Sequence, residues 1–353
     1  LNALVHGGAF SICDAMNPDG TITDKIYHNE IKQLFATTKC IEKYVSGDIQ
    51  SDVAIWYNTE YKVNKNFIQS SFNMAQVMLD YNIAFDVIGS KNLATTKAQV
   101  ICINDPQKVT DEEVEILRQY VNGGGNLFVT AGLGNNKKLE ELVGIKIVGM
   151  SKYGYTYLTP STQDQTFEDF DKSSPYPVES AAFEAQVVGD NVEVLATISY
   201  PYTTRRTHDF AAIHSDPPGV HTNLPAVTKR RVGKGAIIWC ATQLELTTAH
   251  NCKKTIARLV GSMLKTRHFC SNAPSFVEIL KWNKDGKTYV SLVNQQNTAP
   301  VYPIDNIEVT LDKKYSDVKI VSGGNSKLDI SEKDNKTVIK IATLNVFHVL
   351  ELQ

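Results

Sequence analysis

The stretch AQVICINDPQKVTDEEVEILRQYVNGGGNLFVTAG, residues 98–132, decides the fold. It opens on a near-continuous apolar run, 98–104, of the kind found in strands buried on both faces. A helix is predicted over 110–121, and three glycines then end it before a second apolar strand at 126–132. Strands joined by a helical connection of this length pair in parallel. The segment therefore predicts an open parallel sheet.

The residues before this segment extend the same series. Apolar strands are predicted at 52–57 (DVAIWY) and 84–89 (AFDVIG), with an amphipathic helix over 67–81 between them. Within 98–132, Thr110 and Glu113 match a capping box at the helix start. We expect a sheet of at least four parallel strands, flavodoxin-like in style.

Beyond residue 152 the pattern changes to short strands and turns. Strands are predicted at 153–159, 181–189, 192–200 and 210–214. A hairpin follows at 225–242, turning at Val232-Gly233-Lys234-Gly235, and then a helix over 247–265. After Pro274 the chain alternates strands and turns at regular spacing, which is typical of a small antiparallel β-sandwich.

The first residues predict one strand, LNALVH at 1–6, and one helix over 25–46. A single βα unit cannot bury its own apolar faces. We therefore expect it to be the last unit of a larger α/β body that precedes this chain. Ile31, Leu34 and Phe35 on the apolar side of the helix should not be fully covered by a complete barrel within the chain.

Composition excludes several classes of protein. The 353 residues are 42% hydrophobic and 21% charged with a net charge of -2, so a basic nucleic-acid-binding face is not expected. No apolar run reaches the roughly 18–20 residues of a membrane helix. The chain has six scattered cysteines, Cys13, Cys40, Cys102, Cys240, Cys252 and Cys270. They form no CxxC pair, so neither a metal nor a cofactor site is expected. We interpret them as core thiols, which weakly favour a reducing, cytoplasmic compartment.

Three stretches resemble a known family. QYVNGGGNLFVT (119–130), AIHSDPPG (212–219) and the opening VHGGAF (5–10) are similar to the trimeric β-galactosidases and to a related set of glycosyl hydrolases. The resemblance implies the fold class α/β, with three domains. These are the last βα unit of a TIM barrel (1–47), an amidotransferase-like trimerisation domain (48–268) and a C-terminal β-sandwich (269–353).

The resemblance also implies a function. It implies a carbohydrate substrate, a homo-oligomer, and hydrolysis by two barrel carboxylates that lie upstream of this chain. The amidotransferase-like fold can carry a cysteine nucleophile at a strand-to-helix elbow, but Ala131 occupies that position here. Gln243-Leu244-Glu245 replaces the partner His-x-Glu pattern, so no amidotransferase activity is expected. Gly132-x-Gly134 is interpreted as a turn rather than as half of a dinucleotide fingerprint.

The segment 205–221 is the richest in candidate binding residues. A rigid Pro-Pro-Gly turn accompanies several basic side chains suited to bind sugar hydroxyls, namely Arg205, Arg206, His214 and His221. The alternatives are a solvated loop or, with His208, a metal site of non-standard spacing. His6 precedes two glycines at the expected barrel mouth, where it either faces the sugar or holds a backbone carbonyl.

Three functions remain open from the sequence. The first is a glycoside hydrolase region that supports oligomerisation and completes a sugar site. The second is a non-catalytic scaffold or carbohydrate-binding protein, and the third is a small-molecule sensor built on the amidotransferase-like sheet. A carboxylate at the ends of two upstream barrel strands would separate the first function from the second.

Overall fold

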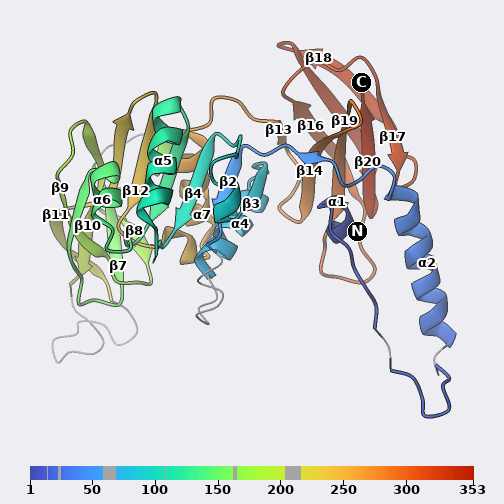
Figure 1. The fold of residues 1–353 in the computed structure, drawn as a ribbon, viewed down its shortest axis with the longest axis horizontal. Helices are drawn as coiled ribbons and strands as arrows, with labels where there is room; N and C mark the ends of the chain where they lie inside the picture. Colours follow the sequence, from blue (N-terminus) through green and yellow to red (C-terminus); the bar gives the residue numbers. More distant parts are fainter. Residues whose placement is uncertain (14, 23–24, 59–68, 107, 162–164, 203–215) are drawn as a thin grey trace. The chain divides into compact units, whose positions relative to one another are not determined.

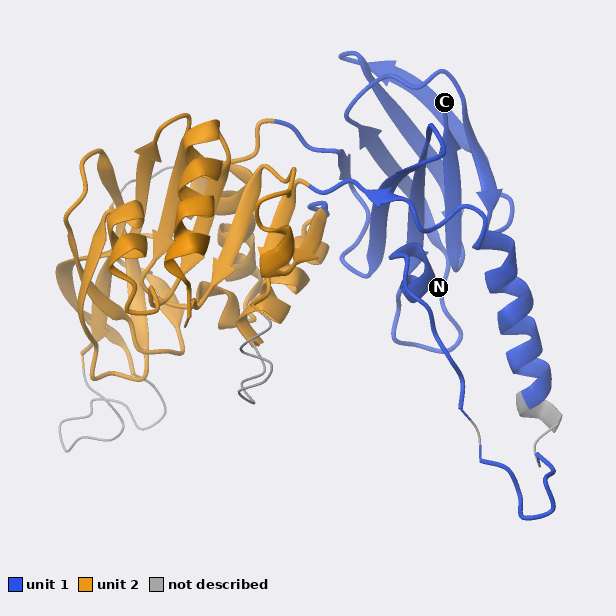
Figure 2. Ribbon diagram, viewed as in Figure 1, with its two compact units in different colours: residues 1–51, 82–84, 266–353 blue, residues 52–81, 85–265 orange. Residues whose placement is uncertain are grey.

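The computed structural model forms two compact units, coloured separately in Figure 2. Unit 1 comprises Leu1–Ser51, Asn82–Ala84 and Thr266–Gln353, and unit 2 comprises Asp52–Tyr81 and Phe85–Lys265. The residues that the structure describes are 1–13, 15–22, 25–58, 69–106, 108–161, 165–202 and 216–353. The predicted strand at 210–214 lies outside them.

A nine-stranded mixed sheet forms the centre of unit 2 (Figure 1). Its parallel half consists, in spatial order, of β3 (Phe85–Ile88), β2 (Val53–Trp56), β4 (Val100–Asn104), β5 (Asn126–Thr130) and β12 (Gly235–Cys240). The four predicted parallel strands are confirmed. The order places the second strand at the edge beside the first and the third on the other side, as in flavodoxin-like sheets.

Antiparallel strands complete this sheet. They are β11 (Pro218–Val232), β10 (Val192–Pro201), β7 (Thr156–Pro160) and β8 (Tyr176–Val178). The β11–β12 hairpin confirms the one predicted at 225–242, and Gly233 takes a positive φ of 55° in its turn. Two further strands, β6 (Ile145–Met150) and β9 (Phe183–Val187), form a separate antiparallel ribbon.

Four helices accompany these strands in the described part of unit 2. They are α4 (Gln69–Asp80), α5 (Asp111–Gly123), α6 (Lys137–Val143) and α7 (His250–Gly261). The predicted capping box is confirmed, since Thr110 Oγ1 accepts from the Glu113 N–H and the Glu113 carboxylate accepts from the Thr110 N–H. Gly124 ends α5 with a positive φ of 110°.

Unit 1 contains two antiparallel sheets with a shared core. One consists of β1 (Asp48–Ile49), β14 (Val277–Lys284), β15 (Lys287–Asn294), β20 (Phe347–Leu352) and β17 (Val318–Ser322). The other consists of β13 (Phe269–Ser271), β16 (Ile304–Leu311), β19 (Lys336–Leu344) and β18 (Leu328–Lys333). Buried side chains of both sheets, such as Leu292 and Ile339, belong to one hydrophobic cluster. The arrangement agrees with the predicted sandwich.

The N-terminal segment departs from the prediction. The expected strand at 1–6 is instead a short helix, α1 (Asn2–Val5). Ala3 and Leu4 are good helix formers and the segment has no neighbouring strand to pair with, and Gly7 ends the turn with a φ of 74°. The second predicted helix forms as α2 (Lys25–Ile41), which ends five residues before Ser46.

Unit 1 also holds the N-terminal segment against its five-stranded sheet. Val5, Ile41 and Val45 pack with Trp282 in a second buried cluster. A Cβ on Gly47 would lie 2.7 Å from the Trp282 ring, so only glycine allows this close approach. In contrast, Leu34 and Phe35 of α2 are 39% and 45% exposed, so no barrel among the described residues covers them.

Candidate functional site

Two polar side chains end the central strands of the parallel sheet. Asn104 is the last residue of β4 and Thr130 the last of β5, and both are buried. The residues that directly follow these strands, Asp105 and Ala131, take left-handed backbone conformations with φ of 46° and 66°, respectively. Such conformations are strained for residues other than glycine and cluster at functional sites. The carboxyl edge of β4 and β5 is therefore our principal candidate.

Glu245 lies at this edge, fully enclosed by protein. It sits in η3 (Leu244–Leu246), the 3-10 turn that follows β12. Its Oε1 atom accepts hydrogen bonds from the hydroxyl of Ser70, from Asn104 Nδ2 at 3.0 Å and from Thr130 Oγ1 at 2.9 Å. Asn73 Nδ2 donates to the Glu245 backbone carbonyl at 3.1 Å. One carboxyl group thus ties α4 to the ends of β4 and β5.

The hydrogen bonds to Glu245 are one-sided. All three side-chain donors reach Oε1, whereas Oε2 has no hydrogen-bond partner among the described residues. Burial raises the pKa of this carboxyl, against the opposing effect of the hydrogen bonds from Ser70, Thr130 and Asn104. Burial thus disfavours the charged form of the group, while the three donors on Oε1 favour it.

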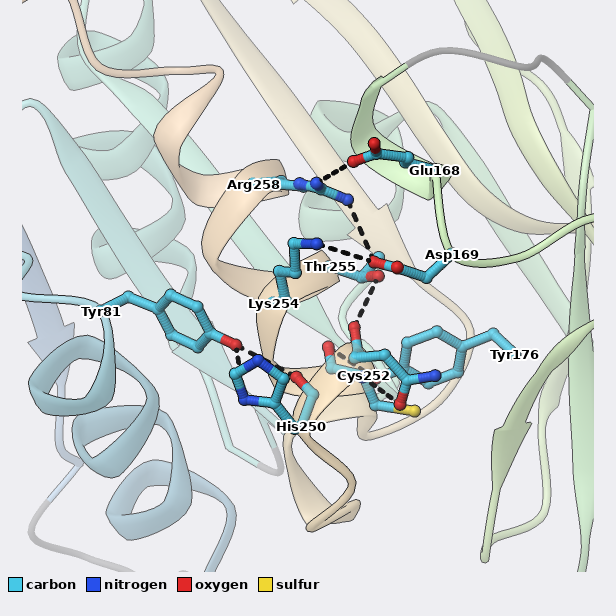
Figure 3. Close-up of polar contacts among 10 residues, drawn as sticks. Tyr81, Glu168, Asp169, Tyr176, His250, Cys252, Lys254, Thr255 and Arg258 are labelled. Atoms are coloured by element: carbon cyan, nitrogen blue, oxygen red, sulfur yellow. Dashed lines mark hydrogen bonds and ion pairs between the residues drawn. The ribbon is translucent and has the colours of Figure 1, made fainter. Parts of the chain in front are cut away.

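Neighbouring contacts fix the segment that carries Glu245. The Tyr176 hydroxyl lies 3.3 Å from the carbonyl oxygens of Leu244, in η3, and of Cys252, in α7. Figure 3 shows the Tyr176 ring pointing to the Cys252 backbone. A single side chain therefore joins the turn to the helix that follows it.

Ion pairs hold the other end of α7. Arg258 contacts both Glu168 and Asp169, and Lys254 Nζ lies 3.4 Å from Asp169 Oδ2 (Figure 3). These side chains are partly exposed, and exposed ion pairs stabilise weakly, so their main effect is to set the position of the helix.

The turn after β5, where the resemblance implies an amidotransferase-like elbow, carries no nucleophile. Ala131 is buried with a φ of 66° directly after β5, and its backbone carbonyl accepts from Trp239 Nε1 at 3.0 Å. A methyl group has no lone pair with which to attack a substrate. Cys102, Cys240 and Cys252 are buried, as predicted for core thiols, and burial raises the pKa of the Cys102 and Cys240 thiols. The prediction is wrong for Cys13, Cys40 and Cys270, which are exposed.

The remaining predicted site residues fall in different places. His6, in unit 1, places Nε2 2.8 Å from Glu278 Oε1, and Gln295 donates to the other oxygen of that carboxylate. The His6 side chain is 40% exposed, whereas that of Glu278 is 8% exposed. A buried carboxylate thus orients a half-exposed imidazole, which can present its ring to a ligand.

His221, in unit 2, is exposed on β11. Its Nδ1 atom lies 2.7 Å from Ser199 Oγ and 3.3 Å from Thr159 Oγ1. Ser199 is fully buried, so this pair positions the ring and is not an accessible nucleophile and base. Arg205, Arg206 and His214 lie outside the described residues.

Sequence patterns alone did not identify Asn104, Thr130 and Glu245 as one cluster. The signal that was present is a polar residue at the end of a largely apolar strand. It is Asn104 after VICI and Thr130 after NLFV. Glu245 meets them across 141 and 115 residues of chain, respectively.

Comparison of the fold with solved structures gives matches over the whole chain. An α-L-fucosidase, isoenzyme 2 of Paenibacillus thiaminolyticus, superposes with a TM-score of 0.77 at 16% identity, covering 100% of this chain and 56% of that one. A β-galactosidase from Bacillus circulans sp. alkalophilus gives 0.65 at 15%, covering 95% and 46%. A GH42 β-galactosidase from G. stearothermophilus gives 0.62 at 14%, covering 96% and 45%.

These matches confirm the resemblance to glycoside hydrolases of the β-galactosidase type at the level of fold. The chain spans about half the length of the solved proteins it matches. The sequence matches no protein-family model and no curated protein. In the described residues, no helix is long and apolar enough to cross a membrane.

Proposed function

We propose that this chain is a region of a glycoside hydrolase that supports oligomerisation and lines a sugar site, whose catalytic carboxylates lie outside these 353 residues. The observation that carries the proposal is the fold: the whole chain matches about half of a fucosidase and of β-galactosidases. The second candidate is a non-catalytic carbohydrate-binding or scaffold protein with an inactive amidotransferase-like domain, favoured by Ala131 at the elbow.

His6 is the described residue best suited to contact a sugar. Glu278, itself held by Gln295, fixes the Nε2 side of the His6 imidazole. The exposed part of the ring is able to hydrogen-bond a hydroxyl. We assign substrate contacts also to His221, Arg205, Arg206 and His214. Arginine pairs bind vicinal hydroxyls or carboxylates through two parallel N–H groups.

Support for oligomerisation comes from exposed apolar side chains in unit 2. The β6–β9 ribbon and the residue after it expose Val148, Met150, Val187 and Val188 at 51%, 61%, 40% and 57%. Apolar groups gathered on one short ribbon are typical of a protein interface.

The prediction that tests substrate lining concerns His214. In the full-length protein, His214→Ala should lower kcat/KM for a nitrophenyl fucoside or galactoside by about tenfold, equivalent to about 1.4 kcal/mol of transition-state binding. The melting temperature should change little. His250→Ala is the matched control, since His250 is an exposed histidine of unit 2 that contacts Tyr81. Unchanged kinetics in His214→Ala would remove this residue from the sugar site.

A further inference from the structure

The four-stranded sheet of unit 1 has one face in the hydrophobic core and one face in solvent. Its strands β16, β19 and β18 lie side by side (Figure 1), and their side chains alternate between the two faces. Ile307 and Ile339 belong to the core. On the other face, Lys340 of β19 has Glu308 of β16 directly opposite on one side and Asp329 of β18 on the other. The sheet thus holds polar side chains in fixed register on its solvent face.

Two cavities lie on this solvent face. Their volumes are about 360 Å³ and about 430 Å³, and Glu308 and Lys340 line both of them. Because the cavities share these walls, they form one groove along β16, β19 and β18, which we call the sheet groove. Ligand pockets have volumes of about 300–1,000 Å³, so each cavity has room for a sugar unit. The sheet groove therefore suits an extended ligand of two or more units.

One end of the sheet groove is basic. Lys333 and Lys336 flank the β18–β19 turn directly opposite each other, and both line the 430 Å³ cavity. Like charges directly opposite each other on a sheet repel. In the part of the chain that the structure describes, neither ammonium group forms an ion pair, whereas Lys340 lies 3.8 Å from Glu308. Asp334 in the turn offsets only one of the two charges. An anionic group between Lys333 and Lys336 relieves their repulsion.

The rest of the sheet groove is polar and electrically balanced. The hydroxyl residues Ser331 and Thr310 come one residue pair after the lysines, on the same face. Asn306 lies toward the other end and adds an amide, which both donates and accepts hydrogen bonds. Donors and acceptors in this mixture match sugar hydroxyls, which also do both. The charged residues that line the 360 Å³ cavity are two lysines and two carboxylates, namely Lys327, Lys340, Glu308 and Asp329.

We propose that the sheet groove binds an oligosaccharide that carries an acidic group, a carboxylate or a sulfate ester. The acidic group lies between Lys333 and Lys336, and the hydroxyls of the following sugar units bind along the groove toward Asp329 and Asn306. The carbohydrate class of the ligand rests on the proposed function. The site itself belongs to unit 1, and binding there requires no hydrolysis.

The test is binding to the 353-residue chain, measured by titration calorimetry at about 0.15 M NaCl, where distant surface charges are screened. The probes are tetragalacturonate, a sulfated galactotetraose and neutral galactotetraose. We expect saturable 1:1 binding of at least one acidic tetrasaccharide with a Kd of about 1 mM or tighter, and binding of the neutral one at least about tenfold weaker.

Three results would overturn the proposal. They are saturation by neither acidic tetrasaccharide, equal affinity for the neutral one, and displacement by inorganic sulfate at the same concentration, which would mean an adventitious ion only. Loss of glycosidase activity in the full-length protein is a separate result, because calorimetry on the 353-residue chain measures binding alone.

Two variants locate the site. The double substitution Lys333→Ser/Lys336→Ser removes the basic end, and Ala342→Trp fills the groove at its other end, where Ala342 is an exposed lining residue. Each should weaken binding at least about tenfold, since charge-assisted hydrogen bonds or space for the sugar are lost. Lys146→Ser/Lys172→Ser is the matched control, because it removes two exposed lysines of unit 2 and changes the net charge equally. Equal weakening by this control, or full affinity in Ala342→Trp, would contradict the assignment.

Discussion

Glu245→Ala is expected to lower the free energy of unfolding of unit 2 by about 4 kcal/mol, a large effect for one substitution. The change removes the acceptor of three buried donors, from Ser70, Asn104 and Thr130, and each unpaired donor costs about 1–3 kcal/mol. It also leaves a cavity in a fully buried site. Urea unfolding followed by circular dichroism measures the difference.

The matched control is Glu245→Gln. Glutamine keeps an oxygen in the place of Oε1 and puts an N–H₂ group in the place of Oε2, which has no partner among the described residues. We expect Glu245→Gln to destabilise unit 2 less than Glu245→Ala does, because the three donors keep their acceptor although the new N–H₂ group has none. If alanine and glutamine destabilise unit 2 equally, the three hydrogen bonds do not contribute as argued.

The pH dependence of stability separates the charge from the hydrogen bonds. Burial raises the pKa of Glu245 above its ordinary value of 4.5, so the folded state binds the proton more tightly than the unfolded state. This contribution to stability is fully present below pH 4.5 and declines as the pH rises through the folded pKa. Glu245→Gln should remove that decline, and an unchanged pH profile in this variant would exclude Glu245 as its source.

Trp282→Ala is expected to cost about 3–5 kcal/mol in unit 1 and to release the N-terminal segment. The indole is 1% exposed, stacks on Tyr289 at 5.8 Å, and donates from Nε1 to the Tyr44 carbonyl at 2.8 Å. It packs with Val5 and Ile41, so its loss removes the surface on which 1–51 is held.

Limited proteolysis measures that release, because cleavage within 1–51 requires local opening. Trp282→Phe is the control: it keeps an aromatic ring against Tyr289 but loses the hydrogen bond to Tyr44, so the effect should be smaller. Rapid cleavage in Trp282→Ala with an intact sandwich is the expected result. Unchanged cleavage would mean that α1 and α2 are held by other contacts.

The parallel sheet was predictable because its signals are local. The apolar runs at 52–57, 98–104 and 126–132 form strands buried on both faces, whereas the edge strand β3 in the run 84–89 exposes Asp86 and Val87. The capping box at Thr110 fixes the start of α5. Periodicity and capping act over a few residues, so one sequence suffices to recognise them.

Other elements lacked such signals. The run 1–6 is apolar like a strand but has no neighbouring strand to pair with, and it forms α1. Strand β18, LDISEK, is almost wholly exposed and carries only two apolar residues, and α6 has only seven residues.

The candidate site was predictable only in part. His6 and His221 stay predictions, made because histidines beside glycine and proline are conspicuous in the sequence; their partners Glu278 and Ser199 come from distant strands and could not be predicted. The Glu245 cluster depends on strand order: β4, β5 and β12 become neighbours only after the sheet has formed. No local pattern encodes which strand ends will meet.

The most direct test of the central proposal compares the 353-residue chain with the full-length protein on a panel of nitrophenyl glycosides that includes the α-L-fucoside and the β-D-galactoside. We predict that the full-length protein hydrolyses at least one of them and that the 353-residue chain hydrolyses none, because we propose that the carboxylate pair required for glycoside hydrolysis lies outside it. Measurable hydrolysis by the 353-residue chain, or none by the full-length protein, would contradict the account.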